Sequence, residues 1–166
     1  EGGHLMHGAV LSYVEANLPE VAADVLDVGG RDINGSPRHL FANASTYLVV
    51  DPQEGPNVDI VADIVGLQFE DFADTVLCLE VLEHAENWRD IVAACAAACR
   101  PGGTVIVTCA GPGRAPHSAV DGGPVQAGEW YRNISSDELA EAMAACGLLV
   151  RAERFDEDTR ATGVKP

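Results

Sequence analysis

The residues best suited to chemistry lie where a short apolar run ends in glycines. Residues 25–35 read V-L-D-V-G-G-R-D-I-N-G, which predicts a buried strand, a tight turn and the start of a helix. Gly29 and Gly30 let a ligand approach the backbone, because no Cβ stands in its way. A second apolar run, residues 47–50, ends at Asp51, 22 residues after Gly29. A carboxylate there can accept hydrogen bonds from a ribose diol, so the two segments indicate an adenosine-containing ligand at the carboxyl edge of a parallel sheet.

The glycine spacing discriminates between two kinds of adenosine ligand. Dinucleotide-binding loops read G-x-G-x-x-G, but here Arg31 occupies the second glycine position and the next glycine is Gly35. A pyrophosphate needs exposed backbone at all three glycine positions, so NAD fits this loop poorly. The chain also has no Tyr-x-x-x-Lys pair, since Lys165 is its only lysine. S-adenosylmethionine (SAM), which has no phosphate, makes fewer demands on the loop.

Three further motifs follow at regular intervals. They are Asp63-Ile64 after the apolar run 58–61, E-V-L-E-H at residues 80–84, and R-P-G-G at residues 100–103. In this order and spacing the chain resembles the class I SAM-dependent methyltransferases, particularly the group whose fourth strand ends in E-V-L-E-H. The resemblance covers residues 24–146, and it departs from the usual D-x-G-x-G motif at Arg31. It implies a single Rossmann-like domain of three α/β/α layers, with a doubly wound, mostly parallel sheet.

The resemblance assigns the adenosine half of the cofactor to three residues. Asp51 is expected to bind both ribose hydroxyls, and Asp63 to accept a hydrogen bond from the adenine amino group, with Ile64 beside the ring. The alternative is that Asp51 is a turn residue at a strand end, and that Asp63 is an exposed loop acid.

The methionine half is assigned to the ends of the first and fourth strands. By resemblance, Asp27 orients the loop that contains Gly29 and Gly30, and Glu80 and Val81 lie under the methionine amine, chiefly through backbone groups. The alternative for Asp27 is a local cap of the following turn.

His84 is the first candidate catalytic residue. A histidine at this rim, with a pKa near neutral, could accept a proton from a hydroxyl or amine nucleophile. The alternative is a structural histidine that hydrogen-bonds the loop. Glu83, just before it, is interpreted as an acid favoured at a helix start by the helix dipole.

The acceptor side is assigned to a long loop and the residues that follow it. Residues 110–128 are rich in glycine and proline and show no periodicity, which is typical of a functional or mobile loop. His117 is the second candidate catalytic residue, and Arg114, Trp130 and Tyr131 are candidate substrate-binding residues. The alternative for the two aromatic residues is ordinary packing.

These assignments predict transfer of a methyl group from SAM to an oxygen or nitrogen of a small-molecule acceptor, with S-adenosylhomocysteine (SAH) as product. The sulfonium is already activated, so the protein mainly has to align the nucleophile and the methyl group. One alternative is a catalytically inactive module that binds SAM or a nucleotide. A less favoured alternative is an NAD-dependent oxidoreductase.

The amino-acid composition limits the kinds of partner that the protein is expected to bind. A net charge of −16 in 166 residues disfavours nucleic acid, and no apolar run is long enough to span a membrane. We therefore expect a cytoplasmic enzyme that acts on a small molecule and is a monomer or a homodimer. Of the five cysteines, Cys95 and Cys99 are one helical turn apart, but no C-x-x-C occurs and alanines flank them. We interpret them as small buried side chains and expect no metal site.

The pattern of apolar residues divides the chain into an N-terminal segment, residues 1–19, and a SAM-binding domain, residues 20–166. The five residues before Met6 are candidates for additions from cloning. Expected helices cover residues 5–18, 37–41, 87–100 and 135–146, and expected strands cover 25–28, 47–50, 58–61, 75–79, 105–108, 148–155 and 159–164. Residues 53–57 are expected to form a loop or a very short helix, and residues 66–72 a short connection.

Overall fold

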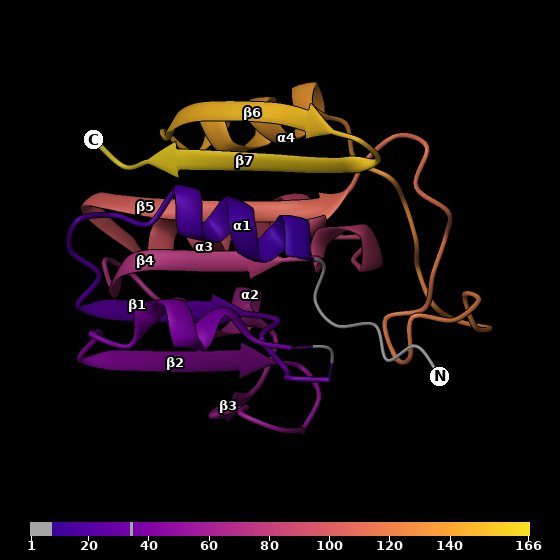
Figure 1. The fold of residues 1–166 in the computed structure, drawn as a ribbon, viewed down its shortest axis with the longest axis horizontal. Helices are drawn as coiled ribbons and strands as arrows, with labels where there is room; N and C mark the ends of the chain where they lie inside the picture. Colours follow the sequence, from indigo (N-terminus) through magenta and orange to yellow (C-terminus); the bar gives the residue numbers. More distant parts are fainter. Residues whose placement is uncertain (1–7, 34) are drawn as a thin grey trace.

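A computed structural model describes residues 8–33 and 35–166, and its centre is a mixed β-sheet (Figure 1). Within these residues the sheet has seven strands in the order β3-β2-β1-β4-β5-β7-β6. Strands β3, β2, β1, β4 and β5 are parallel to their neighbours, whereas β7 pairs antiparallel with both β5 and β6. The strands are β1 Asp24–Val28, β2 Thr46–Asp51, β3 Ile60–Val61, β4 Ala73–Leu79, β5 Cys99–Ala110, β6 Leu149–Phe155 and β7 Asp158–Val164.

Helices cover both faces of this sheet. Helix α1 (Gly8–Ala16) and the 3-10 helix η1 (Pro37–Phe41) lie on one face, in front of the sheet in Figure 1. Helices α2 (Ile64–Leu67), α3 (Trp88–Ala98) and α4 (Ser136–Ala145) lie behind it. The doubly wound, three-layer arrangement predicted from the sequence is confirmed.

Two hydrophobic cores separate the layers, and β4 contributes to both. Leu77 and Leu79 pack with α1, while Val76 and Cys78 pack with α3 on the opposite face. Successive strand residues point to opposite faces, so a strand between two helical layers must be apolar throughout. This is why the central strands read as continuous apolar runs. Burying one such side chain completely contributes about 1.5–3 kcal/mol.

Most element ends agree with the sequence. Ser135 caps α4 through a reciprocal pair of bonds with Glu138, and Ser36 and Pro37 open η1 as expected. Helix α1 ends at Ala16 instead of residue 18, and expected residues 5–7 lie outside the described part of the chain. Among the described residues no helix is both long and apolar enough to cross a membrane.

Two predicted sets of element bounds were wrong, and one short helix was not predicted. Residues 64–67 form this helix, α2, because Asp63 accepts a hydrogen bond from the Val65 amide and so caps a first turn. The third strand is only Ile60–Val61. Strand β5 begins at Cys99, so α3 ends before Arg100.

The R-P-G-G motif lies at the amino end of β5, opposite the edge where a ligand would bind. Arg100 forms ion pairs with Asp24 (2.7 Å) and Asp74 (3.3 Å), which links β5 to the starts of β1 and β4. A Cβ on Gly103 would lie 2.7 Å from the Asp74 carbonyl oxygen and 2.8 Å from the Cys99 sulfur. The motif therefore has a structural role in sheet packing.

This packing predicts the effect of Gly103→Ala. The added methyl meets backbone that cannot move away, so the free energy of unfolding should fall by about 1–3 kcal/mol. Gly66→Ala is the matched control, because a Cβ there meets no atom within 4 Å and the residue is helical. The control should change stability by no more than about 1 kcal/mol. Denaturant unfolding of both variants measures this, and equal stabilities would contradict the packing argument.

Candidate functional site

A cavity of about 980 Å³ opens at the carboxyl edge of the parallel strands. The turns after β1, β2 and β4 form one part of its wall, and residues 114–119 and 122–124 of the long loop form another. Figure 1 shows this loop beside the carboxyl ends of the parallel strands. Ligands of open α/β sheets bind at this edge, so the cavity is the candidate site.

The turn after β1 is held by close contacts that only glycine permits. Gly29 has a φ of +73°, and a Cβ on it would lie 2.3 Å from a methyl group of Val81. A Cβ on Gly30 would lie 2.5 Å from the Asp27 carboxylate. Gly29 and Val81 line the cavity, whereas Asp27 and Gly30 lie behind the turn and are not part of its wall. Arg31, at the expected second glycine position, is accommodated because its side-chain stem packs against Gly55.

Asp27 is a buried carboxyl that supports this turn from below. Its carboxylate accepts a hydrogen bond of 2.7 Å from the Tyr47 hydroxyl, and the residue is 2% exposed. Burial raises the pKa of Asp27 to about 6, and the nearby charge of Asp51 adds to the effect while the Tyr47 bond opposes it. The Asp27 carboxylate thus lies against Gly30, and its role of orienting the glycine loop stays a prediction.

Asp51 lies at the end of β2 and lines the cavity. One carboxylate oxygen accepts a hydrogen bond from the Gln53 amide (2.9 Å) and the other from the Arg31 amide (3.3 Å). These bonds fix the carboxylate between the first two turns. Each oxygen can accept more than one bond, so acceptor positions remain for a ribose diol.

Asp63 and Ile64 follow β3 and also line the cavity. One Asp63 oxygen caps α2, while Ile64 is 4% exposed and joins the core. Asp63 is exposed, in agreement with the alternative interpretation, and its contact with adenine stays a prediction.

The end of β4 carries two glutamates in an unusual environment. Glu80 has a φ of +58° and its carboxyl lies 3.8 Å from Arg114, which also pairs with Asp158. Glu83, in the 3-10 helix η2 (Leu82–His84), is fully buried, and its carboxylate accepts a hydrogen bond of 3.1 Å from the Ala110 amide. Burial and the neighbouring Glu80 carboxyl raise the pKa of Glu83 well above its usual range.

The environment of Glu83 was not predicted from the sequence. The expectation of an acid that merely favours a helix start was wrong, because this carboxyl lies in the interior. The only local signal was that two apolar residues, Val81 and Leu82, directly precede it, which is too short a run to predict burial.

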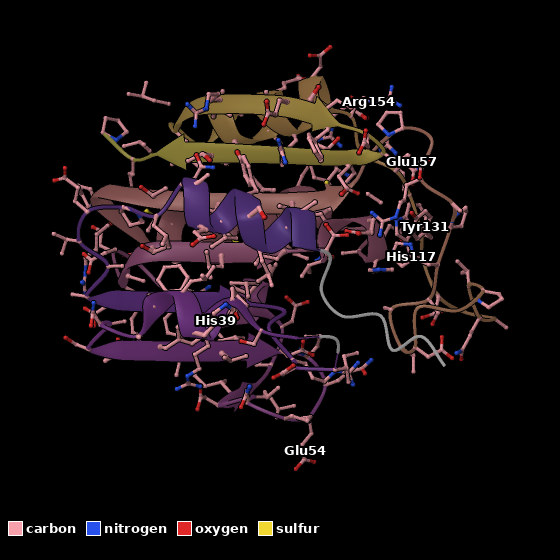
Figure 2. The ribbon with its side chains drawn as sticks, viewed as in Figure 1. His39, Glu54, His117, Tyr131, Arg154 and Glu157 are labelled. Carbon is pink, nitrogen blue, oxygen red and sulfur yellow. The ribbon has the colours of Figure 1, made fainter. Side chains whose placement is uncertain are left out.

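His84, His117 and Tyr131 form a triangle of rings at the far end of the site. The ring centroids lie 4.9 Å apart for the two histidines, and 5.6 Å and 5.1 Å from Tyr131 to His84 and His117. Figure 2 shows His117 and Tyr131 next to each other beyond the edge of the sheet. Both histidines line the cavity, and Tyr131 supports them from outside its wall.

The expected pKa near neutral for His84 was wrong. Burial lowers the pKa of His84 to about 4, and the positive charges of His117 and Arg114 add to this. The ring is therefore neutral near pH 7, with a free lone pair on one nitrogen.

The remaining predicted acceptor residues differ in their placement. Arg114 lines the cavity, but its charge is already balanced by Glu80 and Asp158. Trp130 is 42% exposed and is not part of the wall. The loop itself has a fixed path, because Glu129 accepts hydrogen bonds from the Ser118 hydroxyl and from two loop amides.

The strand order, the glycine turn after β1 and the acid at the end of β2 together define the class I SAM-dependent methyltransferase fold. Comparison with known proteins agrees. Residues 3–153 match a family model described as a methyltransferase domain, and the chain belongs to this family. The family identified by resemblance in the sequence, and its cofactor SAM, are thereby confirmed.

Individual relatives give more detail. A ubiquinone biosynthesis O-methyltransferase of Xanthomonas axonopodis pv. citri (strain 306) is 32% identical over 122 residues, which are 63% of this chain and 50% of the relative. The chain thus spans about half the length of the curated relatives it matches.

Solved structures share the fold at low sequence identity. A Burkholderia thailandensis 1,6-didemethyltoxoflavin-N1-methyltransferase, with 1,6-didemethyltoxoflavin and SAH bound, has a TM-score of 0.71 at 20% identity, over 95% of this chain and 77% of its own. The YcgJ protein of Bacillus subtilis has a TM-score of 0.70 at 14% identity, over 96% of this chain and 99% of its own.

The raised pKa of Asp27 predicts a pH-dependent stability. A carboxyl whose pKa rises from 3.8 to about 6 on folding stabilises the protein fully below pH 4, and this contribution is lost as the pH rises through 6. Asp27→Asn removes the titration but keeps an acceptor for Tyr47. From pH 4 to pH 7 the wild type should therefore lose up to about 3 kcal/mol of unfolding free energy that the variant does not lose. The unfolding free energy of the variant minus that of the wild type should rise by this amount. Denaturant unfolding at several pH values measures this, and a difference independent of pH would contradict the burial argument.

Proposed function

We propose that the protein transfers a methyl group from SAM to an oxygen or nitrogen of a small-molecule acceptor. The observation that carries the proposal is one continuous cavity whose wall includes Asp51 and Gly29 as well as His84 and His117. One end has the chemistry of an adenosine site, and the other has room and polar groups for a second molecule.

The cofactor would lie along the turns of β1, β2 and β4. In this proposal Asp51 accepts hydrogen bonds from the ribose hydroxyls, while Asp63 and Ile64 contact the adenine. Gly29 leaves space for the methionine portion, and Glu80 and Val81 lie beneath its amine. The fixed orientation of the Asp51 carboxylate supports this placement, since both of its oxygens are already aligned by backbone amides.

The acceptor would lie under the long loop. His84 and His117 present imidazole nitrogen atoms to this end of the cavity, and Ala115 and Pro116 present apolar surface. Transfer needs the nucleophile and the methyl group in line at about 3 Å with water excluded, and a loop over the cavity supplies both conditions. Arg114 would hold the loop to Glu80 and Asp158 more than it would bind the acceptor.

The names of the relatives are compatible with this reaction type. The Xanthomonas protein is an O-methyltransferase and the Burkholderia protein is an N-methyltransferase. A SAM-binding module without catalysis is the second candidate, but it needs no cavity beneath the loop, and residues 114–119 line one here. A small-molecule partner, a monomeric or homodimeric state, the absence of a nucleic-acid partner and a cytoplasmic location stay predictions of the sequence.

The cofactor assignment predicts the effect of Asp51→Ala. Loss of the two hydrogen bonds that the ribose hydroxyls would donate to the charged Asp51 carboxylate should weaken SAH binding by about ten- to a few-hundred-fold in calorimetry. Glu54→Ala is the matched control, because this exposed acid lies three residues farther on and outside the cavity wall. Figure 2 shows Glu54 at the periphery of the molecule. NADH should bind more weakly than SAH, and equal or tighter binding of NADH would overturn the cofactor assignment.

The acceptor assignment predicts the effect of His117→Ala. An acceptor is first found by screening small-molecule pools for SAH release. The variant should then keep SAH affinity within about twofold but lose about tenfold or more in turnover, because the residue contacts only the acceptor. His39→Ala, a histidine on η1 outside the cavity wall, is the control and should match the wild type. A large loss of SAH affinity in His117→Ala would make the loop a cofactor clamp, and no loss of either property would leave it without a chemical role.

A further inference from the structure

Glu83, His84 and His117 bring three metal-ligand atoms together at the acceptor end of the cavity. One carboxylate oxygen and one nitrogen from each imidazole lie within 4.8 Å of one another. Glu83 and His84 come from η2, whereas His117 comes from the long loop, 33 positions later. The cluster therefore exists only because the loop returns over the end of β4.

Two of these side chains carry buried atoms that no protein group satisfies. Glu83 is fully buried, and while one of its oxygens accepts the Ala110 amide, the other has no hydrogen-bond partner. Nδ1 of His84 is also buried without a partner. Burying a polar atom without a hydrogen-bond partner is unfavourable, so two adjacent cases indicate a missing component.

The missing component could be a proton or a cation. The Glu80 carboxyl lies near Glu83 and has an unsatisfied buried oxygen of its own, so a proton shared between the two acids would satisfy part of the cluster. A shared proton does not explain the orphaned imidazole nitrogen or the approach of His117. A cation would satisfy the carboxylate and both rings at once.

We propose that Glu83, His84 and His117 bind one divalent transition-metal ion. Two neutral imidazoles and one carboxylate suit zinc, cobalt, iron or manganese, whereas magnesium and calcium prefer oxygen ligands. No metal site was predicted from the sequence, because Cys95 and Cys99 are flanked by alanines and no C-x-x-C occurs. The ligands proposed here are separated by a loop whose path is not visible in the sequence.

The ion would have a role in methyl transfer, and this part of the inference rests on the proposed function. Three protein ligands leave coordination positions open, and His84 and His117 both border the cavity. A hydroxyl group of the acceptor could bind there, and the ion would lower its pKa so that its proton leaves to water. The acceptor oxygen then forms a bond to the methyl carbon as the carbon–sulfur bond breaks, its electron pair stays on sulfur, and SAH results. The acceptor class would be small molecules with a metal-binding hydroxyl.

Cobalt(II) is the probe that tests the site directly. The full chain is treated with a chelator and titrated with Co²⁺, whose visible absorption bands report nitrogen and oxygen ligands. One ion per chain is expected, displaced by Zn²⁺ but not by an equal concentration of Mg²⁺. His117→Ala and Glu83→Gln should weaken Co²⁺ binding by about tenfold or more. Glu83→Gln keeps the shape of the side chain and an acceptor for Ala110, and circular dichroism checks that both variants fold.

Two histidine controls separate this site from other metal-binding positions. His39→Ala removes a histidine on η1, away from His117 in Figure 2. The double variant His4→Ala/His7→Ala removes two near the amino terminus. Both controls should bind Co²⁺ like the wild type. Absence of binding at millimolar Co²⁺, binding unchanged in both site variants, or loss of binding in the double variant would each overturn the proposal.

SAH calorimetry distinguishes failure of this proposal from failure of the proposed function. The chelated protein should bind SAH with unchanged affinity, since none of the three ligands is assigned to the cofactor. If the chelated protein binds SAH and also releases SAH from SAM in the presence of the acceptor at the full rate, the role of the metal ion is overturned and the methyltransferase function stands. Metal binding without SAH binding would overturn the methyltransferase function alone.

Discussion

A single buried carboxylate joins the segments that form the acceptor end of the site. Glu83 accepts the amide of Ala110 at the end of β5, and its own carbonyl oxygen accepts the amide of Arg132 where the long loop returns. The loop is therefore anchored at its departure and its return by the same residue of η2. Because a buried carboxyl is costly without partners, these bonds are strongly favoured over any arrangement that leaves the loop free. The positions of His117 and Tyr131 next to His84 follow from this anchoring.

The cofactor end of the cavity is held by local contacts within and between short turns. There the strands end in parallel at one edge, and short turns carry Gly29, Asp51 and Asp63 to the cavity without any long-range anchor. The carboxylates of Asp51 and Asp63 each accept a hydrogen bond from an amide two residues farther along the chain. Asp51 also accepts one from the Arg31 amide in the neighbouring turn. Local geometry thus determines one half of the site, and a contact between distant segments determines the other.

This difference explains how much could be predicted from the sequence. The fold and the positions of Gly29, Asp51 and Asp63 were accessible, because continuous apolar runs mark buried strands and the acids directly follow them. The Glu83–Ala110 bond joins residues 27 positions apart, and no local pattern predicts it. The pKa of His84 depends on how deeply the loop buries the ring, so it could not be predicted before the loop path was known. Trp130 and Tyr131 were assigned to the cavity from their type and order alone, and the path of the chain places both outside its wall.

The antiparallel strand β7 supplies the acceptor end of the cavity from a part of the chain that is separate from the turns after β1, β2 and β3. Because β7 runs opposite to β5, its first residue, Asp158, lies at the ligand edge and reaches Arg114 directly from a tight hairpin. Insertions or substitutions in that hairpin, and in the long loop it contacts, can reshape the acceptor end without touching the turns after β1, β2 and β3. A change of acceptor specificity therefore requires no change in the turns that carry Gly29, Asp51 and Asp63.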